Sequence, residues 1–168
     1  KNPPHFYAEQ IKYLKYQLQN SKVKKVIFIS STSFYPNTNN TVDVNTNYDF
    51  ANGSSKAVVK GEEQISAISQ ELIILRCGGL MGDDRIPGKW FVGKETQGAD
   101  TPVNYVHRDD VIATIEGLIE GWPQAQKVFN LVSDDHPTRK EVHEKMAEKY
   151  GFELPKWVEP STIQSKVV

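Results

Sequence analysis

The sequence contains a single cysteine, Cys77, among its 168 residues. One cysteine cannot form a disulfide bond within the chain, and it cannot build a metal cluster that needs several thiolates. His107, Asp109 and Asp110 lie close together, but a metal site would need a further ligand, and no spacing pattern supplies one. We therefore expect neither a disulfide framework nor a metal site.

An excess of one charge and long apolar runs are also missing. The 20 Lys and Arg residues nearly balance the 21 Asp and Glu residues, so the formal net charge is -1. No apolar run approaches the roughly 18 residues that a membrane span requires, and residues 1–10 lack the apolar core of a signal peptide. These absences argue against a nucleic-acid or membrane surface, and we expect a cytoplasmic protein.

What is present is the composition of an ordinary globular domain. Hydrophobic residues make up 38% of the chain and charged residues 24%, which are common fractions for soluble domains. A chain of this length buries about 70% of its unfolded surface when it folds. The length therefore predicts one domain that covers residues 1–168.

Helical and strand-like patterns alternate along this domain. Apolar residues recur at a period of 3.6 in three segments, which predicts helices over residues 5–20, 54–69 and 109–120. A capping-box pattern at Thr138 and Glu141, with Gly151 as a C′ residue, predicts a fourth helix over residues 138–150. Short β-branched runs predict strands over residues 23–30, 71–79, 102–107 and 127–132. Such alternation favours a parallel sheet with helices on both of its faces.

Local signals mark several helix ends. Ser54 or Ser55 and Asp109 or Asp110 are N-cap candidates, and Thr138 begins a capping-box pattern. Residues 34–53 and 79–101 have no stable periodicity and predict long loops, whereas residues 152–168 show no clear structure.

Four hydroxyl residues, Ser30 to Ser33, follow the first predicted strand. In open parallel sheets, ligands bind beyond the carboxyl ends of the strands, which predicts that these hydroxyls face a crevice. Hydroxyl side chains also commonly satisfy backbone groups at strand ends and turns. Both interpretations stay open at this point.

Four segments carry a resemblance to a known family. They read VKKVIFISSTSFYP from Val23, ELIILRCGGLMG from Glu71, TPVNYVHRDDVIATIEGLIE from Thr101, and KVFNLV continuing to Pro155. In this order they resemble the extended short-chain dehydrogenases/reductases, in particular the NAD-dependent epimerase/dehydratase family. The resemblance covers about Val23 to Pro155.

The resemblance implies an α/β fold with a Rossmann-like, doubly wound parallel sheet. It also implies a small, irregular C-terminal substrate region and NAD or NADP as the cofactor. Family members begin with a strand and a Gly-x-Gly-x-x-Gly turn that holds the cofactor pyrophosphate, and this sequence contains no such turn. We therefore expect a single partial NAD(P)-binding domain with substrate-binding loops. Its sheet lacks the family's first strands, and its cofactor binding is incomplete in this chain alone.

The resemblance also implies catalytic residues, one of which is missing. Family members use a Tyr four residues before a Lys for proton transfer, together with a Ser or Thr that polarises the substrate. Ser31 matches the hydroxyl and Lys56 the lysine, but Asn52 stands where the Tyr is expected. A second register puts Ser55 and Val59 at these positions, so the chain is similar to the atypical branch of the superfamily. Tyr35 and Tyr48 are the available replacements, although a loop Tyr is more often surface.

The remaining site residues follow from the same resemblance. They are Ser30, Cys77, Gly78, Gly79 and Leu80 for the cofactor, and Thr32, Arg85 and His107 for the substrate. Each has a simpler interpretation: glycines for tight turns, a hydrogen-bonded structural histidine, and solvated charges for Lys56 and Arg85.

The function that the resemblance implies is an oxidoreductase of the epimerase/dehydratase type, acting on a nucleotide-sugar or similar small molecule. The alternative is a non-catalytic relative that senses the dinucleotide or binds another protein. A homodimer is left open.

Overall fold

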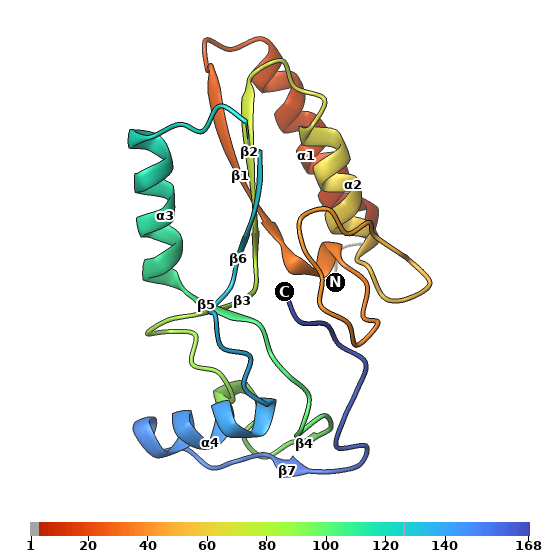
Figure 1. Cartoon of the computed structure of the whole chain (residues 1–168), viewed down its shortest axis with the longest axis vertical. Coiled ribbons are helices and arrows are strands. Elements are labelled where there is room, and N and C mark those ends of the chain that lie inside the picture. The colour runs from red at the N-terminus through yellow and green to blue at the C-terminus, as the bar shows by residue number, and fades with distance from the viewer. Residues whose placement is uncertain (1–3, 126) are drawn as a thin grey trace.

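A three-stranded parallel sheet forms the centre of the computed structural model, which describes residues 4–125 and 127–168 (Figure 1). Its strands are β1 (Lys25–Ser31), β2 (Glu71–Cys77) and β6 (Val128–Leu131), in the order β1-β2-β6. Both strand pairs are parallel. The parallel sheet predicted from the alternation is therefore confirmed.

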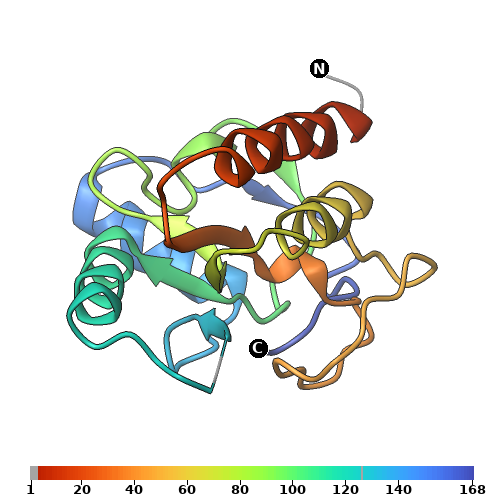
Figure 2. The same cartoon turned by 90° about the horizontal axis from the view of Figure 1, so that it is seen from above.

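Helices cover both faces of this sheet. Helices α1 (Pro4–Gln19) and α2 (Lys56–Ile65) lie together on one face, and α3 (Arg108–Glu120) lies on the other (Figures 1 and 2). Within the two described ranges, none of the helices combines the length and apolarity needed to cross a membrane.

The two faces of the sheet each have their own hydrophobic cluster, because successive strand residues point to opposite sides. Phe28 and Ile74 pack against Ile11 and Ile65 of the two helices on the first face. On the second face the buried members are Ile73, Leu75, Cys77, Val106, Val111 and Leu131. Burying an aliphatic side chain of this size contributes about 1.5–3 kcal/mol, so both helical layers are held firmly to the sheet.

A smaller region lies beyond the carboxyl ends of the strands (Figure 1). It contains α4 (Arg139–Tyr150) and two short parallel pairs that sequence reasoning did not anticipate in full. The first pair joins β3 (Gly79–Met81) to β5 (Tyr105–His107), and the second joins β4 (Glu95–Thr96) to β7 (Lys156–Trp157). Two 3-10 helices, η1 (Thr32–Phe34) and η2 (Lys89–Phe91), complete the elements. Residues 152–168 are thus more ordered than the sequence indicated.

The predicted helix ends are confirmed in two cases and wrong in one. Ser55 caps α2, and Thr138 and Glu141 form the capping box of α4. At α3 the N-cap is His107, whose Nδ1 accepts a hydrogen bond from the Asp109 backbone N–H at 3.2 Å. Asp109 already lies in the first helical turn, where a carboxylate instead interacts favourably with the helix dipole.

Candidate functional site

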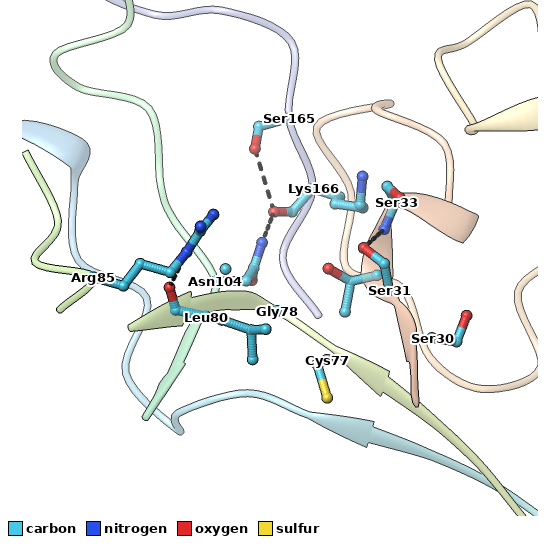
Figure 3. Close-up of a pocket in the computed structure, with 12 residues that line it drawn as sticks. Ser30, Ser31, Ser33, Cys77, Gly78, Leu80, Arg85, Asn104, Ser165 and Lys166 are labelled. Atoms are coloured by element: carbon cyan, nitrogen blue, oxygen red, sulfur yellow. Dashed lines mark hydrogen bonds between the residues drawn. The ribbon is translucent and has the colours of Figure 1, made fainter. Parts of the chain in front are cut away.

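The ends of β1 and β2 open into a pocket of about 410 Å³ (Figure 3). Ser30 pairs in register with Arg76 and Ser31 with Cys77, so both strands stop at the same edge of the sheet. The segments that follow them therefore face one another. The lining residues are Ser30, Ser31, Thr32, Ser33, Cys77, Gly78, Gly79, Leu80, Arg85, Asn104, Ser165 and Lys166.

Ser30 to Ser33 form the first wall of the pocket, and the hydroxyls of this wall have different partners. Ser30 Oγ donates to Glu62 Oε1 at 2.5 Å, on the α2 side of the strand. Ser31 Oγ accepts a hydrogen bond from the Ser33 backbone N–H at 3.1 Å and so caps η1. This bond uses a lone pair of Ser31 and leaves its O–H proton for another acceptor. The hydroxyl run therefore satisfies the backbone and lines a crevice at once.

The second wall is formed by the end of β2 and the start of β3. A Cβ at Gly78 would lie 2.5 Å from the Asn104 carbonyl oxygen, and one at Gly79 would lie 2.7 Å from the Tyr105 ring. The glycine pair is thus required by the close approach of β5. Burial raises the pKa of Cys77, so this residue is present as a neutral thiol that belongs to the core.

Arg85 closes one side of the pocket. Its Nε donates to the Leu80 carbonyl oxygen at 2.8 Å, and its guanidinium carbon lies 5.5 Å from the centre of the Trp90 ring. The hydrogen bond to the backbone and the contact with the ring hold the Arg85 side chain beside the pocket, although the residue remains exposed to solvent.

Three lining residues were missed by sequence reasoning: Asn104, Ser165 and Lys166. Asn104 Nδ2 donates to the Lys166 carbonyl oxygen at 2.9 Å, which joins these distant residues. No local periodicity signals such a contact, because it depends on where residues 152–168 return to the sheet. The only hint in the sequence is that Lys166 occurs in a segment without regular structure.

Two of the predicted site residues do not line the pocket. Lys56 is exposed in the first turn of α2, with its Nζ 5.7 Å from the centre of the Phe50 ring. His107 caps α3 and lies 3.6 Å from the Asp109 carboxylate. All the other predicted site residues are brought together in the pocket.

Neither candidate replacement for the missing tyrosine lines the pocket either. Tyr35 is fully buried, where its hydroxyl donates to Asn130 Oδ1 at 2.7 Å and accepts from Arg76 Nη1 at 2.9 Å. Tyr48 stacks on Phe50 with ring centres 4.8 Å apart. The Tyr35 hydroxyl is therefore committed to a structural role.

A buried ion pair lies directly beneath the first wall. Arg76 Nε and Nη2 donate to the two carboxylate oxygens of Glu62 at 3.0 and 2.7 Å, and both side chains are 6% exposed. The Phe34 ring centre lies 3.5 Å from the Arg76 guanidinium carbon. Burial by itself lowers the pKa of Arg76, but the hydrogen bonds to Glu62 and Tyr35 outweigh it and raise that pKa overall.

A second pocket, of about 320 Å³, adjoins the first through Leu80 and Arg85. Its other lining residues come from β1, the end of β3, the loop after β3 and the start of α3. They are Ile29, Met81, Gly82, Asp83, Asp84, Arg108, Val111 and Ile112. The site as a whole therefore joins a polar compartment to a more apolar one.

Comparison with known sequences finds one curated protein in two Escherichia coli strains. The chain is 30% identical over 153 residues to Protein YeeZ of strain K12, which covers 90% of this chain and 56% of that protein. Protein YeeZ of strain O157:H7 matches to the same extent. The chain thus spans about half the length of the curated relatives it matches. No family model matches the chain.

Comparison with solved structures finds the same architecture in longer proteins. A Methylobacillus flagellatus protein assigned to the NAD-dependent epimerases/dehydratases is 22% identical, with a TM-score of 0.69 over 97% of this chain and 64% of that one. Bacillus cereus UDP-glucuronic acid 4-epimerase, in complex with UDP-glucuronic acid and NAD, is 14% identical, with a TM-score of 0.74 over 96% and 57%. Human epimerase family protein SDR39U1, with NADPH, is 16% identical, with a TM-score of 0.71 over 92% and 56%.

Proposed function

Because the chain has the Rossmann-like fold of these epimerase and dehydratase structures, we propose that it is part of an atypical NAD(P)-dependent oxidoreductase. Its substrate would be a nucleotide-sugar or a similar small molecule. The observation that carries this proposal is the pocket, in which the hydroxyls at the end of β1 meet the Cys77 to Leu80 segment at the end of β2. Such strand-end crevices are where this class of sheet binds its ligands.

The residues present suit one half of a nicotinamide cofactor. Gly78, Gly79 and Leu80 would border the ring, since the glycines bring the backbone to the pocket wall. When bound, the cofactor would accept a hydride and return it. The Gly-x-Gly-x-x-Gly turn that holds a pyrophosphate is missing from the sequence, so we expect this chain alone to bind the cofactor incompletely.

Within the chain, Ser31 is the strongest candidate for orienting the substrate. Its O–H proton is free of the backbone bond that fixes the side chain, so it can donate to a substrate oxygen. Thr32 and Arg85 would contact the rest of the substrate. Lys56 and His107 are candidates of lower rank, because they lie outside the pocket.

A second candidate function is favoured by the missing tyrosine. Tyr35, the tyrosine nearest to Ser31 in the sequence, has its hydroxyl bonded to Arg76 and Asn130 and cannot reach a ligand as arranged. A relative without a general base would bind the dinucleotide without turning over a substrate. It would then serve as a sensor or as an interaction partner.

Calorimetric titration separates the two functions. NAD(H) and NADP(H) are titrated into the full-length protein, and nicotinamide reduction is then followed with a panel of nucleotide sugars. An oxidoreductase should bind a cofactor and transfer hydride to or from at least one of them. Binding without turnover across the panel would favour the sensor, and the absence of any cofactor binding would contradict both.

A further inference from the structure

The segment of residues 163–168 contributes a lysine to the lining of the pocket. Lys166 lies in this segment, and among the described lining residues Arg85 is the only other cation. None of the described lining residues is acidic. The polar compartment thus combines two positive charges with several hydroxyls and one amide, and this combination suits an anionic group.

The position of Lys166 is set by backbone bonds to the Asn-rich loop of residues 37–42. Val42 N–H donates to the Val167 carbonyl oxygen at 2.8 Å, and Val167 N–H donates to the Asn40 carbonyl oxygen at 3.2 Å. Asn39 N–H donates to the Ser165 carbonyl oxygen at 2.8 Å. These bonds hold the segment on both sides of Lys166, so the lysine backbone is fixed by a pattern resembling a short strand pair.

The Lys166 side chain is buried without a counter-charge. Only 9% of the residue is exposed, and its Nζ donates to Asn37 Oδ1 at 2.7 Å. In the described part of the chain, no carboxylate forms an ion pair with it. An ammonium group has three N–H donors, so two remain after the bond to Asn37.

An uncompensated buried ammonium is unfavourable. Burial accordingly lowers the pKa of Lys166. A purely structural role would be served equally well by a neutral donor to Asn37, which would avoid the desolvation of a charge. The observed arrangement is more easily explained if another molecule supplies the missing negative charge.

We infer that Lys166 is a ligand-binding residue, which pairs with an anionic group, phosphate or carboxylate, of the molecule in the pocket. Arg85 assists from a separate wall (Figure 3). This inference rests on the proposed function only in taking the strand-end pocket as the ligand site. It adds the Asn-rich loop and residues 163–168 to that site.

The test uses variants of Lys166 and three anionic probes. Lys166→Met removes the charge and keeps an apolar stem of similar length, and Lys166→Arg restores a cation. The matched control is Lys60→Met, which alters an exposed lysine of α2. UDP, UDP-glucose and UDP-glucuronic acid are titrated calorimetrically into each folded protein. We expect Lys166→Met to weaken binding about tenfold or more, Lys166→Arg to recover most of it, and Lys60→Met to have no effect.

The three probes distinguish the source of the anion. An equal loss for all three assigns Lys166 to the diphosphate, whereas a loss confined to UDP-glucuronic acid assigns it to the sugar carboxylate. Unchanged binding to a folded Lys166→Met protein, or no binding of any probe to the unmodified protein, would overturn the inference.

A measurement on the unmodified protein covers the case in which the variant does not fold. Lysine acetylation is followed by mass spectrometry with and without UDP, and UDP should protect Lys166 but not Lys60. Equal labelling in both conditions would contradict the inference. The proposed function is tested separately by hydride transfer. A negative result in the Lys166 test therefore does not decide the proposed function, and a negative hydride-transfer result does not decide the role of Lys166.

Discussion

Two groups of polar side chains lie at the ends of β1 and β2. They differ in how many of their hydrogen-bond donors and acceptors have partners within the chain. On the α2 side, hydrogen bonds join Ser30, Glu62, Arg76, Tyr35 and Asn130 in what we call the closed network. Its central members Glu62, Arg76 and Tyr35 are buried. On the pocket side, Ser31 and Lys166 each retain donors that no described residue accepts. Side chains that bond to one another inside the fold indicate a structural role, and donors left without an acceptor beside a pocket mark the surface where a ligand would bind.

The largest effect should come from opening the closed network at its ion pair. Glu62→Gln removes the charge opposite Arg76 and leaves a guanidinium buried at 5% exposure. Breaking a buried pair from one side costs about 3–5 kcal/mol. Urea unfolding of the variant should show a loss of this size in the free energy of unfolding.

The neighbouring residue supplies the control for this measurement. Glu63 is exposed on the same helix, so Glu63→Gln should change stability by only about 0.5 kcal/mol or less. If Glu62→Gln were as mild as Glu63→Gln, the network would not have the structural role assigned to it.

A third polar group, His143, is buried without a hydrogen-bond partner among the described residues, and it lies outside the pocket. It is 0% exposed, both of its ring nitrogens lack hydrogen bonds, and its ring stacks between Phe91 and Trp157 at 5.5 and 5.3 Å. Burial, with a smaller contribution from the positive charge of Arg139, lowers the pKa of His143 to about 4. The neutral ring is therefore the form that the aromatic stack holds at neutral pH.

The lowered pKa predicts how stability depends on pH. The unfolded chain takes up a proton at His143 near the ordinary pKa of 6.5, whereas the folded chain does so only near 4. The unfolded state therefore binds more protons between these values, and the free energy of unfolding should fall as pH drops from about 6.5 toward 4, by roughly 2–3 kcal/mol.

His143→Phe isolates this contribution because the ring stack is kept and the titration is removed. The free energy of unfolding, measured with denaturant from pH 7 to pH 4, should depend less on pH for the variant than for the unmodified protein. Parallel pH profiles for the unmodified protein and His143→Phe would contradict the assignment.

Much of the central sheet and few of the long-range contacts could be predicted from the sequence. The helices and the strands β1, β2 and β6 were predicted because periodicity and β-branched runs are local signals. The pairing of β4 with β7 was not, since two-residue strands lying 61 residues apart carry no local pattern. The helix α3 cap was assigned to the wrong residue, because several adjacent polar residues can each cap a helix.

The candidate site shows the same difference between residues marked by local signals and residues placed by long-range contacts. Ser30 to Ser33 and Cys77 to Leu80 lie at the carboxyl ends of predicted strands, so the rule for parallel sheets brought them together. Lys166 was not predicted, because its place depends on how residues 163–168 pair with the Asn-rich loop. The fully buried position of Tyr35 depends likewise on contacts with Arg76 and Asn130, which are distant in sequence.

A smaller effect is expected from a single hydroxyl of the closed network. Tyr35→Phe leaves the ring in place but removes the acceptor of Arg76 and the donor to Asn130. Loss of such buried partners costs about 1–3 kcal/mol, which thermal and urea unfolding would detect. Tyr48→Phe, which alters a tyrosine outside the network, should be nearly neutral. Similar stability for both variants would place Tyr35 outside the structural network.

The smallest change in stability, and the sharpest comparison, comes from the adjacent serines Ser30 and Ser31. Ser30 also lines the pocket, but its hydroxyl donates to Glu62. Ser30→Ala should therefore cost about 1 kcal/mol in unfolding free energy with ligand affinity retained. Ser31→Ala removes only the cap of a three-residue 3-10 helix, which should cost about 0.5–1 kcal/mol, while binding of UDP-sugars or turnover falls. Calorimetry measures the ligand affinity of both variants, and urea unfolding measures their free energy of unfolding. If Ser31→Ala bound as well as Ser30→Ala, the two sides of β1 would not divide structure from ligand binding, because their neighbouring hydroxyls would then have equivalent roles.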